Sequence, residues 1–406
     1  MNTPMKLPGA RGALRVAVVT ETYPPEINGV ARTVGLMVEV LRKRGHEVQL
    51  VRPRQGRERD PSPTPVLRER LVAGFAIPFY RHLQIGLASP SMLHKEWSHW
   101  RPDLVHVVTE GPLGWAAVSA AERLAIPVCS DFHTNFHSYS RHYGLGIFAG
   151  AVARYLRALH NRAECTLVPT AEMRANLEAL AFERVTVVGR GVDTQLFSPA
   201  RRSERLRAAW GCGQGDIVVL HVGRLAPEKN LGVFVEAALG MQGIDPKLRV
   251  VLVGDGPQGP ALRKRHPDFV FAGMRTGEDL AEHYASADVF LFPSTTETFG
   301  NVTLEAMASG LAVVAYDYAA AQQYLRHGVS GLLAPRGDAG EFAQMAARLA
   351  RNRKLGSRFG LEARRAAEAA SWDRAFDDLE RVLRHIAGAV RAEVDGTRRE
   401  SAHVET

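Results

Sequence analysis

The sequence predicts an α/β protein in which two doubly wound, parallel-sheet domains follow each other and face each other across a cleft. The first observation is the length of 406 residues, which is more than one hydrophobic core normally organises. The second is a strand–loop–helix–strand unit near the N-terminus that occurs again in the second half of the chain. The third is that the expected strands are nearly continuous apolar runs, typical of strands buried on both faces of a parallel sheet.

The first unit begins with an apolar strand at residues 15–20, which is followed by a loop rich in turn-forming residues. Apolar residues then recur at helical spacing over residues 30–44, which predicts a helix with Asn28 as its N-cap and Gly45 just after its end. Residues 46–51 are expected to form the next strand. Further strands of this half are predicted at residues 104–108, 127–130 and 166–168.

The second unit repeats this order, with a strand at residues 216–222, a polar loop, a helix at residues 231–239 and a strand at residues 248–253. Further strands of this half are predicted at residues 269–271, 289–292 and 312–315. Strands and helices therefore alternate in both halves, which is the pattern of parallel sheets.

The domain boundary is predicted near Pro199, where polar and charged residues interrupt the periodic pattern. We expect an N-terminal domain at residues 14–198 and a C-terminal domain at residues 199–371. Residues 372–390 have the spacing of an amphipathic helix, which is expected to pack back on the N-terminal domain. Residues 391–406 are polar and are expected to form a disordered tail.

The composition is that of a soluble globular protein, with 46% apolar and 23% charged residues. The net charge of +8 fits nucleic acid, an anionic membrane surface or a small anionic substrate as partner. No nucleic-acid reading motif accompanies this charge, so nucleic acid is not an expected partner. The three cysteines are far apart, which argues against a zinc site or a disulfide framework. Without a signal peptide or an apolar run of about 18 residues, a cytoplasmic location is expected.

The loop at residues 223–230 follows an expected strand, and so lies at the edge where open α/β sheets bind ligands. It contains two cations, Arg224 and Lys229, beside the start of a predicted helix. An arginine can bind two oxygen atoms of a phosphate at once, and a lysine adds a compact positive charge. This arrangement suits a diphosphate, although solvated surface charges would give the same pattern.

A second segment, residues 292–310, runs from a strand through a polar turn into a short helix. Glu297 lies on the turn and Glu305 lies inside the helix. Unpaired N–H groups at a helix start bind anions such as phosphate. Here those groups belong to Gly300, Asn301 and Val302. Glu297 can then bind sugar hydroxyls and Glu305 a ribose; alternatively, Glu297 only caps the helix and Glu305 faces water.

The E-x7-E spacing of Glu297 and Glu305, the loop GRLAPEKN and the later segment HGVSGLLAP resemble retaining glycosyltransferases of family 4. The likeness extends over nearly the whole chain, with one departure at Asn28, where the family often has a second glycine. It implies the GT-B fold, in which two Rossmann-like domains face each other, the N-terminal one binding the acceptor and the C-terminal one the nucleotide-sugar donor. It also implies transfer of a hexosyl group from that donor. It also implies that no metal or other cofactor is needed, and the sequence contains no Asp-x-Asp.

Carried over residue by residue, the resemblance gives catalytic roles to Arg224, Lys229, Glu297 and His133. Arg224 and Lys229 would bind the donor diphosphate and Glu297 the transferred sugar, whereas His133 would lie near the anomeric centre. Glu305 would bind the ribose. The remaining residues expected around the donor are Gly29, Gly254, Gly273, Met274, Gly300, Asn301 and Val302.

The N-terminal segments TETYPPEINGV, SDFHTNFHSYSRHYGLG and LHNRAECTLVPT are most similar to GDP-mannose-dependent α-mannosyltransferases and sulfoquinovosyl-diacylglycerol synthases. This similarity implies GDP-mannose as the donor and a lipid or glycan as the acceptor. UDP-glucose or another UDP-hexose is the alternative donor. A nucleotide-sugar epimerase and a non-catalytic sugar-nucleotide-binding protein are less favoured. A nicotinamide dehydrogenase is disfavoured because the leading strands lack G-x-G-x-x-G.

Two basic stretches point to an anionic membrane surface. Residues 52–70 contain six arginines against three acidic residues, and an apolar run follows at residues 71–80. The second stretch, residues 143–162, includes Arg154, Arg157 and Arg162. Together they predict peripheral contact with the inner face of the cytoplasmic membrane. The alternative is a solvated loop, a core segment and an ordinary helix.

Overall fold

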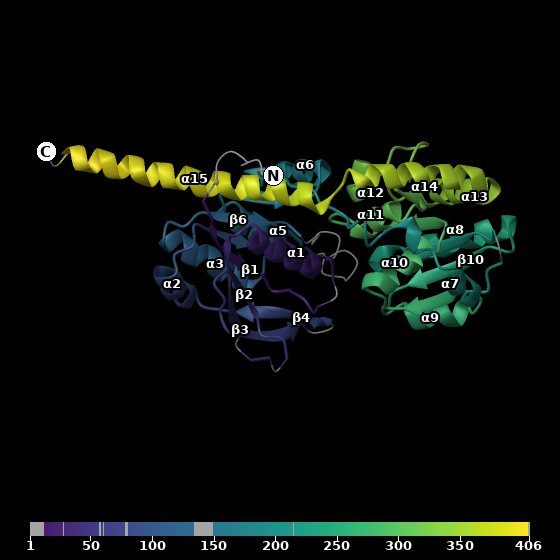
Figure 1. Cartoon of the computed structure of the whole chain (residues 1–406), viewed down its shortest axis with the longest axis horizontal. Coiled ribbons are helices and arrows are strands. Elements are labelled where there is room, and N and C mark those ends of the chain that lie inside the picture. The colour runs from purple at the N-terminus through teal and green to yellow at the C-terminus, as the bar shows by residue number, and fades with distance from the viewer. Residues whose placement is uncertain are drawn as a thin grey trace, which may run out of the picture.

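The structure is a computed structural model that describes residues 12–26, 28–56, 58–59, 61–77, 80–133, 149–213 and 215–404. It contains two α/β domains side by side, each with a central sheet and covering helices (Figure 1). Among the described residues, the N-terminal sheet has eight strands and the C-terminal sheet has six. The fold class expected from the sequence is confirmed. The chain crosses between the domains twice, and the two crossing segments pair at a bridge between Val192 and Ser371.

The N-terminal sheet has the strand order β4-β3-β2-β1-β5-β6-β7-β8 and is parallel apart from the antiparallel pair β3–β4. Its strands are β1 (Arg15–Val19), β2 (Glu47–Pro53), β3 (Leu67–Ile77), β4 (Tyr80–Leu87), β5 (Leu104–Val107), β6 (Val128–Asp131), β7 (Cys165–Val168) and β8 (Val185–Val187). Its helices are α1 (Gly29–Lys43), α2 (Pro90–His99), α3 (Pro112–Arg123), α5 (Ala149–His160) and α6 (Ala171–Ala179). Residues 71–77 and Tyr80 of the apolar run therefore lie on the two strands of a hairpin, and residues 78–79 lie outside the described residues.

Helix α1 begins and ends at the residues that cap it. The Asn28 side chain accepts a hydrogen bond of 2.8 Å from the Ala31 amide, one of the amides that a helix start leaves unpaired. Arg42 and Lys43 lie in the last turn, at the negative end of the helix dipole. The buried face consists of Ala31, Thr33, Val34, Met37, Val38 and Leu41. This face packs on β1 and β2. Because α1 follows the carboxyl end of β1 along the chain, its start lies at the carboxyl edge of the sheet.

The C-terminal sheet has the order β11-β10-β9-β12-β13-β14 and its pairs are parallel. Its strands are β9 (Val218–Val222), β10 (Arg249–Val253), β11 (Val270–Gly273), β12 (Val289–Phe292), β13 (Ala312–Tyr316) and β14 (Gly331–Ala334). Its helices are α7 (Glu204–Ala209), α8 (Leu231–Ile244), α9 (Gly259–Arg265), α10 (Gly277–Ala285), α11 (Asn301–Ala308), α12 (Ala319–Tyr324), α13 (Ala339–Arg351) and α14 (Arg353–Glu368), with 3-10 turns η2 (Pro199–Arg201) and η3 (Pro227–Lys229).

Helices cover both faces of the C-terminal sheet. Val219 of β9 packs with Phe234 of α8 in the cluster on one face. The next residue, Leu220, packs with Leu304 of α11 in the cluster on the other face. Successive residues of the strand therefore point into opposite apolar layers, which explains the continuous apolar run in the sequence.

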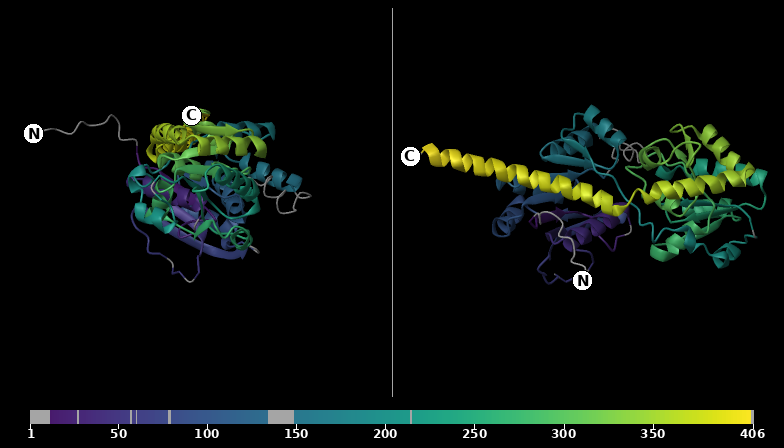
Figure 2. Two further views of the ribbon diagram at one scale, coloured as in Figure 1. Left: turned by 90° about the vertical axis from the view of Figure 1, so that its right-hand side faces the viewer. Right: turned by 45° about the horizontal axis from the view of Figure 1, so that its top comes forward.

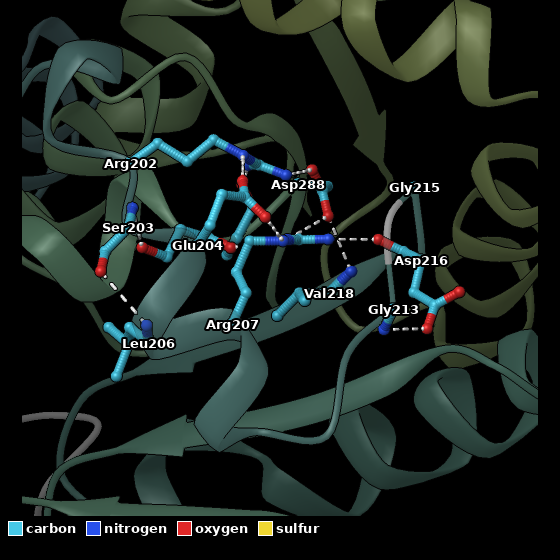
Figure 3. A network of polar contacts seen from close by, with 12 residues as sticks. Arg202, Ser203, Glu204, Leu206, Arg207, Gly213, Gly215, Asp216, Val218 and Asp288 are labelled. Atoms are coloured by element: carbon cyan, nitrogen blue, oxygen red, sulfur yellow. Dashed lines mark hydrogen bonds and ion pairs between the residues drawn. The ribbon is translucent and has the colours of Figure 1, made fainter.

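A buried arginine ties helix α7, which follows the first crossing segment, to the C-terminal sheet (Figure 3). Arg207 of α7 is 2% exposed and donates to the carbonyl groups of Ser286 (2.8 Å) and Asp216 (2.6 Å). It also donates to Asp288 Oδ2 (3.1 Å), which accepts a second bond from the Val218 amide (2.8 Å). The guanidinium thus has a partner on each side, and it fixes α7 to the ends of β9 and β12 without leaving a buried charge unpaired.

Helix α15 (Trp372–Val404) returns to the N-terminal domain and runs along it (Figures 1 and 2). Leu379, Leu383 and Ile386 are buried there, in one cluster with Val16 of β1 and Val34 of α1. The last helix is therefore part of the N-terminal core, although the chain that precedes it belongs to the C-terminal domain.

The C-terminal end of α15 differs from the sequence prediction. Polarity predicts a disordered tail at residues 391–406, but the helical backbone continues through Val404. Good helix formers such as Arg391, Ala392 and Glu393 extend a helix whose first turns are already held by packing, so no new helix nucleus is needed. In the part of the chain that the structure describes, no helix is long and apolar enough to cross a bilayer.

Two carboxylates lie where β1 and β5 end. Glu21 follows β1, and its Oε1 atom accepts from the amides of Gly86 (3.2 Å) and Leu113 (3.3 Å). A Cβ at Gly111 would lie 1.8 Å from Glu21 Oε2, so a side chain at this position would displace the Glu21 carboxylate. Burial raises the pKa of Glu21 to about 7. The nearby Glu110 adds to this rise, and hydrogen bonds from backbone amides partly offset it.

We expect Glu21→Gln to change how stability depends on pH. The Glu21 pKa is higher in the folded than in the unfolded chain, so its contribution to stability is full below pH 4.5 and is lost as the pH rises through about 7. Glutamine keeps an oxygen acceptor without the charge. Thermal unfolding should therefore show similar melting temperatures near pH 4.5 and a higher one for the variant at pH 8. Parallel curves for the two proteins across this range would contradict the raised pKa.

Replacing Leu383 by alanine tests the packing of α15. Leu383 is fully buried, so the variant leaves a cavity in the N-terminal core and should lose about 2–5 kcal/mol of unfolding free energy. Leu361→Ala is the matched control, because Leu361 is 54% exposed and its loss should change that energy by less than about 0.5 kcal/mol. Denaturant unfolding followed by circular dichroism measures both. Equal effects of the two substitutions would contradict the account of α15.

Candidate active site

Three glycines allow the loops at the carboxyl ends of β9, β10 and β11 to approach one another closely. Gly223, Gly254 and Gly273 have φ values of +153°, +129° and +73°, which favour glycine. A Cβ on Gly254 would lie 2.0 Å from the Gly223 carbonyl oxygen, and the Gly254 amide donates to the Gly273 carbonyl (2.8 Å). The three loops therefore meet at one edge of the sheet. Met274, which is 52% exposed, follows there.

Lys229 and Glu297 form an ion pair at this edge. Lys229 ends η3 after β9 and Glu297 lies on the turn after β12; their side chains are 19% and 14% exposed. Ser294 Oγ donates to Glu297 Oε1 (2.6 Å), and the Glu297 amide donates to the Tyr318 hydroxyl oxygen (3.0 Å). Two residues that the sequence predicts for the donor site are thus in direct contact.

The environment of Glu297 keeps its carboxylate ionised. Burial alone would raise the pKa of Glu297, but the charge and hydrogen bond of Lys229, together with the hydrogen bond from Ser294, lower it below its ordinary value. The N-cap of α11 is Gly300, which makes no side-chain cap. Glu297 is therefore not a helix cap, which removes one alternative reading of the sequence.

Glu305 points into the protein and not into water. It lies on α11 and is 5% exposed. Its Oε2 atom accepts from the Tyr284 hydroxyl (3.1 Å), and its Oε1 atom forms an ion pair with Arg32 of α1. The alternative of a solvent-facing Glu305 is therefore wrong. Arg32, which no sequence motif singled out, brings the N-terminal domain to this carboxylate.

The starts of α1 and α11 face each other between the domains. An added Cβ on Gly29, the first residue of α1, would lie 3.5 Å from Asn301 Nδ2 at the start of α11. Gly300 precedes Asn301 with φ +90°, and Val302 follows in the first turn. Asn301 Oδ1 is buried without a hydrogen-bond partner among the described residues. Two helix N-termini bring partial positive charge to one place, which suits an anion.

Arg224 differs from Lys229 in its surroundings. Its side chain is 38% exposed and lies 3.6 Å from the buried Glu228 carboxylate, four residues along the chain. It therefore lies at the open side of the loop, whereas Lys229 points toward Glu297.

His133 lies at the end of β6 with both ring nitrogens engaged. Arg190 Nη2 lies 2.7 Å from Nδ1, and Asp131 Oδ2 lies 3.0 Å from Nε2. Because arginine can only donate, Nδ1 accepts, and Nε2 carries the proton that goes to Asp131. Burial lowers the pKa of His133 and the charge of Arg190 lowers it further, while Asp131 acts in the opposite direction. The polar contacts of this neutral imidazole lie in the N-terminal domain and the first crossing segment.

The network around His133 contains residues that sequence reasoning missed. His106 Nε2 lies 2.9 Å from Asp131 Oδ1. Burial would raise the pKa of Asp131, but its contacts with His106 and His133 outweigh burial and move the pKa far below its ordinary range. The position of Asp131, at a strand end two residues before His133, was the available signal. Residues 134–148, which include the last three residues of the SDFHTNF segment, lie outside the described residues.

Comparison with known proteins assigns the chain to a family. The family model for glycosyl transferases group 1 matches residues 216–352, and that for Glycosyltransferase Family 4 matches residues 27–196. The two matches thus fall in the two domains.

Individual proteins agree with these matches. A GDP-mannose-dependent alpha-mannosyltransferase of Mycobacterium tuberculosis is 35% identical over 375 residues, covering 90% of this chain and 95% of the relative. A sulfoquinovosyl transferase of Arabidopsis thaliana is 30% identical over 368 residues, covering 88% and 71%. The solved structure of sucrose-phosphate synthase from Thermosynechococcus elongatus has a TM-score of 0.74 at 20% identity, covering 93% of this chain and 100% of that one. The chain therefore belongs to glycosyltransferase family 4 and is a glycosyltransferase with the GT-B fold.

Proposed function

We propose that this glycosyltransferase moves mannose from GDP-mannose to a lipid or glycan acceptor with retention of configuration. The observation that carries the proposal is the ionised Glu297 paired with Lys229 at the edge where α11 begins. The choice of GDP-mannose is supported by the mannosyltransferase that is 35% identical over 90% of this chain. A UDP-hexose donor is the alternative.

The proposed roles follow from the charges at this edge. The donor diphosphate would lie between the start of α11, Lys229 and Arg224, which offset the negative charge that grows on the leaving group. Glu297 would accept hydrogen bonds from hydroxyls of the transferred sugar, and Glu305 from those of the ribose. Gly254, Gly273 and Met274 would line the base.

No metal enters the proposed reaction, because cationic side chains and helix amides supply the positive charge that the leaving diphosphate needs. A metal chelator should therefore leave turnover unchanged.

His133 would lie beside the anomeric centre, as the resemblance implies. Its ring is fixed by Asp131 and Arg190, and its pKa is lowered by burial. We therefore assign it the role of shaping the site around the sugar, with no proton exchange at the ring nitrogens.

A donor panel tests the proposed substrate. Wild-type protein is incubated with GDP-mannose, UDP-glucose and other sugar nucleotides, with lipid extract as the acceptor source, and released GDP and UDP are measured with and without chelator. We expect GDP release from GDP-mannose under both conditions. UDP release from a UDP-sugar, with none from GDP-mannose, would contradict the donor assignment.

Two substitutions test the site residues. Lys229→Ala and Glu297→Ala should each lower kcat/KM by about 10-fold or more, because each removes charge or orientation at the transition state. Lys247→Ala and Glu236→Ala are matched controls, since both residues are exposed elsewhere on the C-terminal domain. Near-normal rates for both site variants would overturn the assignment.

We further propose that the N-terminal domain meets an anionic membrane surface through the β3–β4 hairpin. Phe75 and Leu87 are each 49% exposed, and the pairing of Ala73 with Leu87 puts them on the same face of the hairpin. The basic stretches carry less free charge than their composition suggests. Arg52 pairs with Glu58 and Glu69, and Arg162 pairs with Glu122. Part of the second stretch, residues 143–148, lies outside the described residues.

Vesicle binding tests the membrane proposal. Combined Phe75→Ser and Leu87→Ser should lower co-sedimentation with anionic phospholipid vesicles several-fold, because apolar area that enters the interface is lost. Leu361→Ser, at a 54% exposed site of the C-terminal domain, is the control. Unchanged sedimentation of the double variant would rule out this surface.

A further inference from the structure

One charged contact joins the two domains at a proposed donor-binding carboxylate. Arg32 of α1 forms an ion pair with Glu305 of α11, although the residues are 273 positions apart in the sequence. The Arg32 side chain is 38% exposed and that of Glu305 is 7% exposed. A solvent-accessible cation thus reaches from one domain to a buried anion of the other.

The surroundings of Glu305 fix the direction of its carboxylate. Oε1 is paired with Arg32, and Oε2 accepts from the buried Tyr284 hydroxyl (3.1 Å). An ionised carboxylate can accept about four hydrogen bonds, so these two partners leave lone pairs for further donors. A carboxylate this deeply buried would be destabilised in its charged form without such partners. Arg32 and Tyr284 therefore fix the direction of this carboxylate and leave it able to accept hydrogen bonds from hydroxyl groups.

Arg32 is itself held in place where the domains join. Its guanidinium carbon lies 5.4 Å from the centre of the Phe197 ring, and Phe197, in the first crossing segment, is 1% exposed. One turn earlier on α1, Gly29 faces Asn301 of α11. The cation is thus supported by a fixed aromatic face and by the close approach of the two helices.

We propose that Arg32 is a positioning residue, which orients the Glu305 carboxylate for the ribose hydroxyls of the donor and so makes donor binding depend on the N-terminal domain. The proposal rests on the ribose role of Glu305 given above. A purely structural tie between the domains would affect any ligand of the cleft alike, whereas a residue that acts through Glu305 affects the recognition of ribose hydroxyls.

The experiment measures dissociation constants by titration calorimetry for GDP, 2′-deoxy-GDP and 3′-deoxy-GDP. We expect wild-type protein to prefer GDP over at least one deoxy analogue by about 10-fold, the effect of one hydrogen bond to a charged group. Arg32→Ala should weaken GDP by about 10-fold and leave that analogue nearly unchanged, so that the preference falls toward one. Arg32→Lys, which can still pair with Glu305, should recover part of it.

Two further variants separate the positioning role from a general defect. Glu305→Gln should lose the same preference, and adding Arg32→Ala to it should cause little further loss, because both act through one carboxylate. Lys43→Ala is the control on the same helix, since the Lys43 side chain is 72% exposed and pairs along the helix with Glu39. It should bind like wild type.

Each outcome has a distinct meaning. If wild type prefers GDP and Arg32→Ala keeps that preference, Arg32 is only a structural tie and the proposal is overturned while the ribose role of Glu305 stands. If wild type does not distinguish ribose from both deoxyriboses, the ribose role of Glu305 falls, and this proposal falls with it. If wild type binds UDP in place of GDP, the same series with UDP and its deoxy analogues decides, and a lost preference in Arg32→Ala still supports the proposal.

Discussion

A carboxylate buried in a protein needs a cation or hydrogen-bond donors beside it, and this requirement organises the contacts around the start of α11. Glu297 meets it within the C-terminal domain through Lys229 and Ser294. Glu305 meets it through Tyr284 and, from the other domain, Arg32. Both carboxylates are thereby held close to the start of α11. The contact between Arg32 and Glu305 also ties the two domains together.

The two sheet edges that meet at this place differ in their chemistry. The C-terminal edge combines Arg224, Lys229 and the start of α11, and suits a negatively charged diphosphate. On the N-terminal edge, burial raises the pKa of Glu21 to about 7 and lowers that of His133, so the neutral forms of these two groups are favoured. Neutral groups suit the uncharged hydroxyl groups of an acceptor. This difference supports the expectation that the C-terminal domain binds the donor and the N-terminal domain the acceptor.

The features of the fold that depend on neighbouring residues along the chain could be predicted from the sequence. Helix α1 starts at Gly29 because Asn28 caps it, and the continuous apolar strands reflect burial on both faces. The E-x7-E segment indicates the family. Lys229 contacts Glu297 because the parallel strands that precede them end at the same edge of the sheet. Contacts between distant segments could not be found in this way. Arg32 has no local feature that distinguishes it from other helix-surface arginines, and the His106–Asp131–His133 contacts arise only when β5 and β6 lie side by side. The helical end of α15 depends on packing of its first turns.

We expect the donor diphosphate to lie between Lys229 and the start of α11, with the ribose at Glu305. A crystal structure of the complex with GDP-mannose would test this placement. We expect diphosphate oxygens at hydrogen-bond distance, about 2.7–3.2 Å, from Lys229 Nζ and from a first-turn amide of α11, and a ribose hydroxyl at the same distance from Glu305. A diphosphate bound away from Lys229, or a ribose that does not contact Glu305, would contradict it.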